Sequence, residues 1–165
     1  MSTLYKRIEL QANVAIIIVA VLIGAVMVRG YFFTKAAQPS KAIASGTKVS
    51  LPGVEWERNG KTLVLALQKG CHFCSESAPF YQRLVQAAAA KGVKLVAVLP
   101  QPQAESREYL EGLAVPVADI RQATLGSLSV KGTPTLILVN DKGEVAASWV
   151  GKLPSDKESD VLAKL

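Results

Sequence analysis

The sequence contains few of the side chains that bind metals or clusters. It has two cysteines, Cys71 and Cys74, and one histidine, His72, which lies between them. An iron–sulfur cluster held by four thiolates needs more cysteines than this chain has. Three Cys and His side chains within four consecutive residues also cannot surround a tetrahedral zinc ion. Covalent haem is excluded because Ser75, not histidine, follows Cys74. We therefore expect neither a metal nor a bound cofactor.

The sequence also lacks the charge pattern of a nucleic-acid-binding protein. Its 165 residues carry 19 Lys and Arg against 13 Asp and Glu, a formal net charge of +6. Six of the basic residues and one acidic residue fall within residues 1–50, which leaves 13 basic and 12 acidic residues in the rest. Aromatic residues make up only 6% of the chain. Binding to nucleic acid needs a basic stripe or patch, so we expect no nucleic-acid partner.

One long apolar run lies near the start, from Val14 to Val28, without a single polar side chain. A soluble helix normally keeps one polar face, and a cleaved signal has a small-x-small site beside its apolar run. Neither feature is present here, and about twenty such residues cross a bilayer. Basic residues flank both sides almost equally, so charge does not settle the orientation. The predicted organisation is a short tail (1–11), a transmembrane anchor (12–33), a flexible linker of small and polar residues (34–47) and a folded domain (48–165).

The domain alternates apolar strands with helical segments and contains no internal repeat. Residues 48–57 alternate loosely and predict an early hairpin with the next strand through Asn59-Gly60. This order predicts a three-layer α/β domain with a mixed central sheet. The expected strands are Thr62–Leu67, Val93–Leu99, Val115–Val117, Thr135–Val139 and Glu144–Val150; the expected helices are Ser75–Lys91, Glu105–Leu113 and Ser155–Leu165, the last capped by Ser155, with a helical turn at Ala123–Leu128.

The segment Gly70-Cys71-His72-Phe73-Cys74 lies where a buried strand meets a helix. Free backbone N–H groups and the helix dipole at that point favour a negative charge, which lowers the pKa of the Cys71 thiol, and a protonated His72 acts in the same direction. Cys71 is therefore the expected nucleophile. Cys74, one turn inside, is the expected resolving thiol. Two buried small residues, half of a zinc site in a dimer, or an inert structural disulfide remain the alternatives for a lone Cys-x-x-Cys.

A second feature is Gly132-Thr133-Pro134-Thr135, in which Pro134 opens a buried strand. A proline there either begins the strand in the ordinary trans form or is a cis-proline that brings the backbone beside the thiols. The residue pattern alone leaves both open.

Taken together, these residues resemble the thioredoxin superfamily over residues 48–165. The likeness consists of the strand leading into Cys-x-x-Cys, Pro79 five residues after Cys74, the Thr133-Pro134 pair before a strand, and the closing hairpin and helix. The inserted segment between the second strand and the Thr-Pro strand is similar to that of the membrane-anchored, extracytoplasmic thioredoxin-like (TlpA-like) proteins of bacteria, which include the reductases of cytochrome c maturation.

The resemblance implies a thioredoxin-like fold and a thiol-disulfide oxidoreductase in which Cys71 and Cys74 cycle between dithiol and disulfide. It implies that Pro134 is cis and that Thr133 offers its backbone to a substrate segment. The expected partners are proteins with disulfides or dithiols, and a membrane or soluble thiol that donates electrons. The expected location is the bacterial inner membrane with the domain in the periplasm. Reduction of partners is favoured; an oxidase or isomerase, or a tethered binding factor without turnover, are the alternatives.

Three departures from the thioredoxin pattern concern the surroundings of the thiols. Lys69-Gly70 replaces the tryptophan that commonly precedes the first cysteine, and Leu65 stands where thioredoxin has a buried acid. His72 follows the first cysteine rather than preceding the second, which leaves the direction of electron flow open. Glu76 is a candidate base, although an acid in the first helical turn more simply complements the dipole.

Overall fold

The computed structural model describes residues 17–24 and 42–165, which belong to two separate units of the chain. Residues 17–24 are helical, and their large apolar side chains are exposed. No helix among the described residues is long and apolar enough to span a membrane. The predicted tail lies outside the described residues, and so do most of the predicted anchor (12–33) and most of the predicted linker (34–47).

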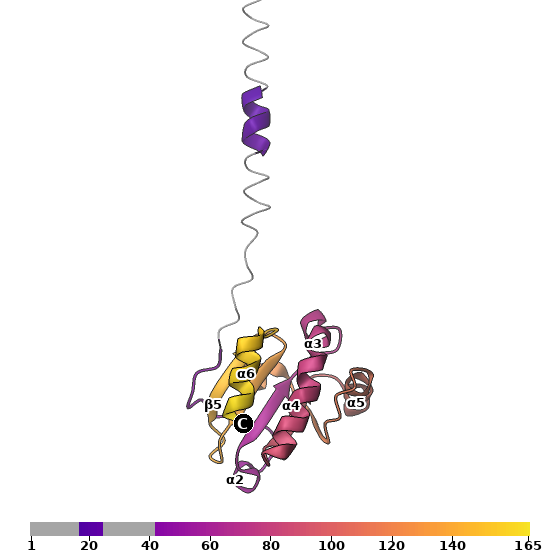
Figure 1. The fold of residues 1–165 in the computed structure, drawn as a ribbon, viewed down its shortest axis with the longest axis vertical. Helices are drawn as coiled ribbons and strands as arrows, with labels where there is room; N and C mark the ends of the chain where they lie inside the picture. Colours follow the sequence, from indigo (N-terminus) through magenta and orange to yellow (C-terminus); the bar gives the residue numbers. More distant parts are fainter. Residues whose placement is uncertain (1–16, 25–41) are drawn as a thin grey trace, which may run out of the picture. The chain divides into compact units, whose positions relative to one another are not determined.

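Within residues 42–165 the chain forms a five-stranded mixed sheet (Figure 1) in the order β3-β2-β1-β4-β5. β1 is parallel to β2 and antiparallel to β4, while β3 is parallel to β2 and β5 antiparallel to β4. Every residue of β1 and β4 is buried, as continuous apolar runs in central strands require. The predicted mixed sheet is therefore confirmed. Its strands are β1 (Thr62–Ala66), β2 (Lys94–Leu99), β3 (Asp119–Gln122), β4 (Thr135–Val139) and β5 (Val145–Val150).

The two faces of the sheet are covered differently. Leu63 and Leu65 of β1 join a hydrophobic cluster with residues of four helices. Val64 and Ala66 point to the other face, where extended chain around Leu51 and a 3-10 helix cover them. The expected third layer is thus built mainly from extended chain and short helical turns rather than from long helices. The helices are α2 (Trp56–Asn59), α3 (His72–Glu76), α4 (Ala78–Ala90), α5 (Gln103–Gly112) and α6 (Ser155–Lys164), with the 3-10 helix η1 at Leu125–Leu128.

The predicted hairpin between residues 48–57 and β1 is wrong. This segment lies instead along the outer edge of β5, where Val145 N–H donates to the Thr47 carbonyl at 2.9 Å and Val49 N–H donates to the Gly143 carbonyl at 2.8 Å. Lys48 forms an antiparallel bridge with Glu144, and residues 56–59 are helical. Backbone N–H and C=O groups on the open edge of β5 thereby gain hydrogen-bond partners. Residues 43–47, predicted as linker, already contact β5.

The long helix predicted at Ser75–Lys91 begins three residues earlier and is divided at Ser77. α3 ends at Glu76 and α4 begins at Ala78, with Ser77 at φ −87° and ψ 0° between them. Pro79 then falls in the first turn of α4, where a missing N–H has no helical partner to lose. The division therefore gives the two cysteines a short helix of their own, with Cys71 at its N-cap and Cys74 within it.

Two further local predictions are wrong. Residues 115–117 do not form a strand, because Val117 N–H donates to the Val115 carbonyl at 3.0 Å in a tight turn. The strand follows at Asp119–Gln122. The N-cap position of α6 is Pro154 rather than Ser155, and no side chain caps that helix.

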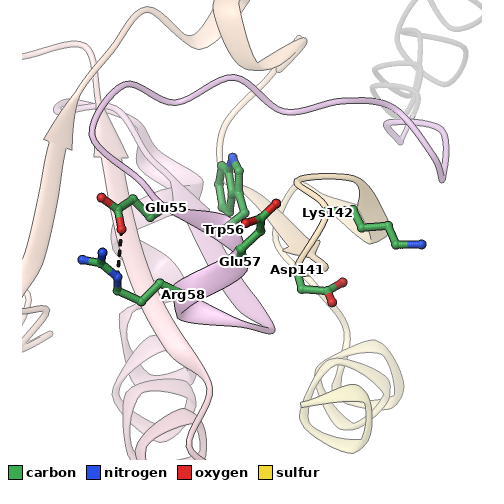
Figure 2. A pocket seen from close by; sticks show the side chains of 6 residues that line it. All are labelled: Glu55, Trp56, Glu57, Arg58, Asp141 and Lys142. Atoms are coloured by element: carbon green, nitrogen blue, oxygen red, sulfur yellow. Dashed lines mark ion pairs between the residues drawn. The ribbon is translucent and has the colours of Figure 1, made fainter.

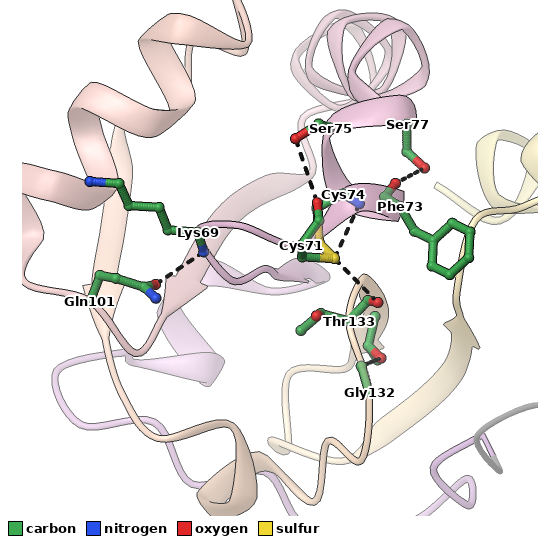
Figure 3. Close-up of a disulfide and its surroundings, with 10 residues drawn as sticks. Lys69, Cys71, Phe73, Cys74, Ser75, Ser77, Gln101, Gly132 and Thr133 are labelled. Carbon is green, nitrogen blue, oxygen red and sulfur yellow. Dashed lines mark hydrogen bonds between the residues drawn. A yellow bond between two sulfur atoms is a disulfide. The ribbon is translucent and has the colours of Figure 1, made fainter. Parts of the chain in front are cut away.

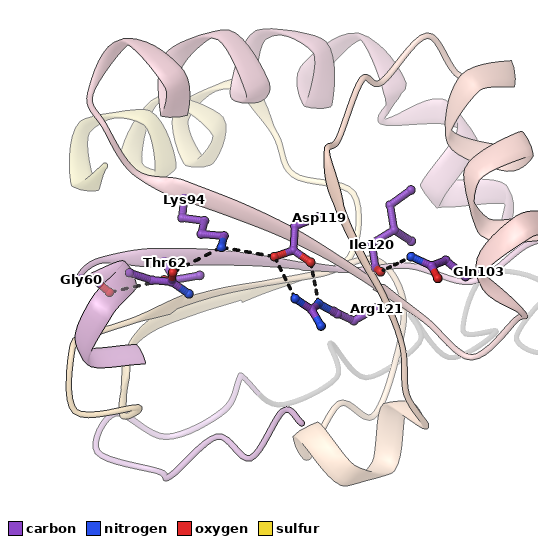
Figure 4. A network of polar contacts seen from close by, with 8 residues as sticks. Gly60, Thr62, Lys94, Gln103, Asp119, Ile120 and Arg121 are labelled. Atoms are coloured by element: carbon purple, nitrogen blue, oxygen red, sulfur yellow. Dashed lines mark hydrogen bonds and ion pairs between the residues drawn. The ribbon is translucent and has the colours of Figure 1, made fainter. Parts of the chain in front are cut away.

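Edge strand β3 is held by polar side chains (Figure 4). Asp119 is ion-paired with Arg121 and with Lys94, whose Nζ is 3.4 Å from the carboxylate. Partial burial raises the pKa of Asp119, but the hydrogen bonds and charges of Arg121 and Lys94 lower it by more. The pKa of Asp119 therefore lies below its usual value. Gln103 Nε2 donates to the Ile120 carbonyl at 3.2 Å. The ion pairs join β3 to β2, and the Gln103 hydrogen bond attaches the start of α5 to this edge of the sheet.

Candidate active site

Cys71 lies at the carboxyl end of β1, where the chain turns into α3. The turn passes through Gly70 at φ +82°, a backbone conformation that glycine adopts without steric cost. Cys71 occupies the N-cap position of α3, and its Sγ accepts a hydrogen bond from the Cys74 backbone N–H at 3.2 Å. The same N–H also donates to the Cys71 carbonyl at 3.1 Å, so it is shared between the two acceptors of Cys71. A negative charge on the Cys71 sulfur would therefore meet a donor already in place.

Cys71 and Cys74 form a disulfide, with their Cα atoms 5.2 Å apart (Figure 3). Their exposure differs sharply. Cys74 is 0% exposed and belongs to the main hydrophobic cluster, whereas Cys71 is half-buried at its border. An external sulfur therefore reaches Cys71 and not Cys74, which supports the predicted division into nucleophile and resolving thiol.

The Thr133-Pro134 segment lies directly beside the disulfide. The Thr133 carbonyl oxygen is 3.5 Å from Cys71 Sγ, a distance at which the reduced thiol donates to it (Figure 3). The Thr133–Pro134 peptide bond is cis. Thr135 Oγ1 donates to the Gly132 carbonyl at 2.7 Å, and Gly151 N–H donates to the Pro134 carbonyl at 2.7 Å. The fold thus brings together Cys71, Cys74 and Thr133, as the sequence predicted, and hydrogen bonds fix the loop that carries Thr133.

The loop before the cysteines is anchored by a residue that sequence reasoning did not single out. Lys69 N–H donates to Gln101 Oε1 at 3.4 Å, and Lys69 Nζ is 3.4 Å from Glu105 of α5. Gln101 follows β2, so its proximity to Lys69 depends on the parallel pairing of β1 and β2. The backbone entering Cys71 is therefore attached to the start of α5.

His72 and Glu76 form a polar group on the exposed side of α3. His72 Nε2 is 3.1 Å from Glu76 Oε1, and Lys152 Nζ is 3.1 Å from Glu76 Oε2. The hydrogen bond from Lys152 lowers the pKa of Glu76, outweighing partial desolvation, and the charge of His72 adds to this. Glu76 is thus an ion-paired carboxylate, poorly suited to the role of a base for Cys74. Lys152 was missed because it lies 76 residues along the chain.

Two further observations complete the surroundings of the disulfide. Leu65, at the place of the thioredoxin acid, is fully buried in the same cluster as Cys74. Phe73, between the cysteines, is 54% exposed and is the large apolar side chain most open to solvent in residues 42–165. The buried sulfur therefore has an apolar surrounding, while an aromatic ring lies open beside the accessible one.

Other candidate sites lie elsewhere or are absent from the described part of the chain. No group of three or more Cys, His, Asp or Glu side chains in residues 17–24 and 42–165 is placed to hold a metal ion. An open depression is lined by α2 residues, including Trp56, and by the turn after β4 (Figure 2). Because Thr62 pairs with Val139 and Ala66 with Thr135, this turn is at the end of the sheet opposite the disulfide. It is not part of the thiol site.

A family model named Redoxin matches residues 37–165. The chain belongs to the Redoxin family. This match covers the whole domain that carries the disulfide and the Thr133 loop. No curated protein matches the chain.

Solved structures with the same fold include three bacterial proteins. A thiol:disulfide interchange protein from Bacteroides sp. is 20% identical with a TM-score of 0.55, over 77% of this chain and 89% of that one. The thioredoxin domain of a thiol-disulfide oxidoreductase from Bacteroides vulgatus is 20% identical with a TM-score of 0.54, over 79% and 96%. StoA from Bacillus subtilis is 20% identical with a TM-score of 0.52, over 73% and 96%. The predicted thioredoxin-like fold is therefore confirmed.

The Redoxin domain and its Cys-x-x-Cys disulfide together identify a thiol-disulfide oxidoreductase. The pair has one accessible and one buried sulfur, which is the arrangement that exchange through a mixed disulfide requires. The direction of exchange and the partners are separate questions.

Proposed function

We propose that this Redoxin-family chain reduces disulfide bonds of partner proteins through the Cys71/Cys74 dithiol. The observation that carries thiol-disulfide exchange is the difference in exposure between the two sulfurs, with the accessible one 3.5 Å from the Thr133 carbonyl. The resemblance to the extracytoplasmic thioredoxin-like proteins that include the reductases of cytochrome c maturation favours the reducing direction. A partner disulfide reaches Cys71 alone, and the mixed disulfide then lies within reach of Cys74.

The reaction proceeds in two exchanges. The Cys71 thiolate attacks one sulfur of the partner disulfide, and the partner's other sulfur leaves as a thiolate and takes a proton from solvent. Cys74 loses its proton and attacks Cys71 Sγ, so the mixed disulfide breaks and the partner's first sulfur leaves. Two electrons have moved from the Cys71/Cys74 pair to the partner. A membrane or soluble thiol donor then reduces the pair again.

Thr133 positions the partner in this account. Its backbone lies beside Cys71 and is held by hydrogen bonds within the Gly132–Thr135 loop. An extended partner segment that pairs with this backbone places its own sulfur next to Cys71, as in other cases of strand addition. Main-chain pairing of this kind tolerates many side chains, which suits an enzyme with protein substrates.

One observation favours the reverse reaction as a second candidate. The Cys74 N–H donates to Cys71 Sγ, and a donor at this atom stabilises the thiolate and therefore the reduced pair. A stabilised dithiol makes the disulfide a stronger oxidant. The same bonds then form and break in the opposite order, and the chain donates its disulfide to partners.

Reduction of insulin by dithiothreitol tests the proposal, with the full-length chain as catalyst. Wild-type protein should accelerate precipitation of the insulin B chain. Cys71→Ser should abolish the acceleration. Reduced Cys74→Ser, mixed with insulin after removal of dithiothreitol, should accumulate a mixed disulfide at Cys71 because no second thiol resolves it. A substitution far from the site, Glu55→Gln, serves as the control and should retain the wild-type rate. Acceleration that survives loss of both thiols would refute the proposal and favour a binding role.

We propose further that the chain is a single-pass protein of the bacterial inner membrane with its Redoxin domain in the periplasm. The apolar run from Val14 to Val28 supports an anchor at residues 12–33. Fusion of alkaline phosphatase or green fluorescent protein after Leu165 tests the orientation. Active phosphatase with no fluorescence is expected, and the opposite result would place the domain in the cytoplasm.

A further inference from the structure

The cluster beside the disulfide joins one carboxylate to a histidine and a lysine from different parts of the fold. Glu76 and His72 lie on successive turns of α3, and Lys152 lies between β5 and α6. Each partner is 3.1 Å from a different oxygen of Glu76. The carboxylate is therefore fully engaged, and its two oxygens connect α3 with the loop that follows β5.

The other charges around the disulfide do not neutralise Lys152. Lys69, two residues before Cys71, is paired with Glu105 of α5. Lys131, just before the Gly132–Thr135 loop, is exposed and has no ion pair among residues 42–165. Glu76 is thus the acid that offsets positive charge on the α3 side of the disulfide.

The charge of Glu76 bears directly on the redox equilibrium. Reduction breaks the S–S bond, adds two electrons, and leaves negative charge on Cys71 to the extent that its thiol is ionised. Glu76 follows Cys71 by five residues, roughly 8 Å along a helix axis. A carboxylate at that distance disfavours a thiolate, whereas the positive charge of Lys152 favours it.

We propose that Glu76, as a positioning residue, sets the reduction potential of the Cys71/Cys74 pair by neutralising Lys152. Once neutralised, Lys152 stabilises the thiolate less, and the dithiol stays a better reductant. The inference rests on the proposed function, because it concerns the same disulfide. It assigns to the Glu76–Lys152 pair a role in choosing between the reducing and the oxidising direction.

Equilibration of the full-length chain with reduced and oxidised glutathione tests this, with free thiols counted after alkylation. In each measurement two glutathione thiols are oxidised to one glutathione disulfide as the Cys71/Cys74 disulfide is reduced. Glu76→Gln should shift the equilibrium toward the dithiol about fivefold at low ionic strength, which is about 20 mV less negative, since 30 mV corresponds to about tenfold. Lys152→Gln should shift it by a similar factor in the opposite direction.

A matched control separates local charge from general surface effects. Glu55→Gln breaks a comparable exposed pair with Arg58, whose atoms are 2.9 Å apart near the other end of the sheet, and should leave the potential unchanged. The Glu76→Gln and Lys152→Gln shifts should shrink in 1 M KCl, where the screening length is about 3 Å. A structural loosening would not respond to salt in this way.

Two results would overturn the inference: equilibria for Glu76→Gln and Lys152→Gln within twofold of wild type, or shifts of both variants in the same direction. Failure of the proposed function is a different result. In that case the wild-type disulfide itself does not exchange with glutathione, whatever residue stands at position 76.

Discussion

The two cysteines should differ strongly in reactivity once the disulfide is reduced. In Cys71→Ser, the remaining thiol of Cys74 is 0% exposed and lies among core side chains. A reagent reaches it only after local opening of α3. If opening requires on the order of 3 kcal/mol, the reaction slows more than about 100-fold, because each 1.4 kcal/mol is tenfold. In Cys74→Ser, Cys71 remains half-buried at the helix start and should react without such an opening.

Alkylation of both reduced variants by iodoacetamide, followed by mass spectrometry, measures the two rates. Each rate is divided by the rate for the same variant unfolded in guanidinium chloride, which removes the intrinsic reactivity of the thiol in the unfolded chain. We expect the normalised rate of Cys71→Ser to be at least about 100-fold below that of Cys74→Ser. Similar normalised rates would show that Cys74 is accessible, and the assigned roles of nucleophile and resolving thiol would then be wrong.

Three substitutions test other parts of the structure. Asp119→Asn should lower the unfolding free energy by about 1 kcal/mol at pH 7 in urea titrations. Because the folded pKa of Asp119 is lowered, its contribution is present above about pH 4 and is lost as pH falls through the folded pKa. The unfolding free energies of wild type and variant should therefore converge in acid, and a difference that stays constant with pH would contradict this. Gly143→Ala should cost about 1–3 kcal/mol in thermal melting, since its Cβ would lie 2.8 Å from Trp56 Cδ1 at φ +73°; an unchanged melting temperature would refute that packing. Leu65→Asp should destabilise the protein by several kcal/mol at pH 7 and by less at pH 4. The site is fully buried and offers the new carboxylate no partner, which disfavours its charged form. A destabilisation that is the same at both pH values would contradict this.

The sequence predicted the centre of the sheet well because its central strands are continuous apolar runs. β1, β2 and β4 lie within one residue of their predicted bounds. β3 was misplaced because Asp119–Gln122 reads Asp-Ile-Arg-Gln and has no apolar run, while Val115 and Val117 are buried without being a strand. The strand-like contact of residues 46–49 with β5 was missed because it joins residues about 100 positions apart.

The residues of the site were likewise predicted where they belong to local motifs and missed where only the fold brings them together. Cys71, Cys74 and the Thr133-Pro134 pair were predicted because each belongs to a short motif whose chemistry is local. Lys152 was not found, since its contact with Glu76 exists only once β5 and α3 are placed by the fold. No spacing rule links residues so far apart, and a lysine in a loop is ordinarily a solvated charge.

Redox titration of the wild-type full-length chain against glutathione tests the central claim most directly. The account predicts a single two-electron transition in which the Cys71 and Cys74 thiols, alkylated after acid quenching and unfolding, appear together. For a protein that reduces its partners, the midpoint should lie at about −250 mV or lower. A midpoint between about −180 and −120 mV would contradict the reductive direction. A disulfide that does not exchange at any glutathione ratio would contradict thiol-disulfide exchange itself.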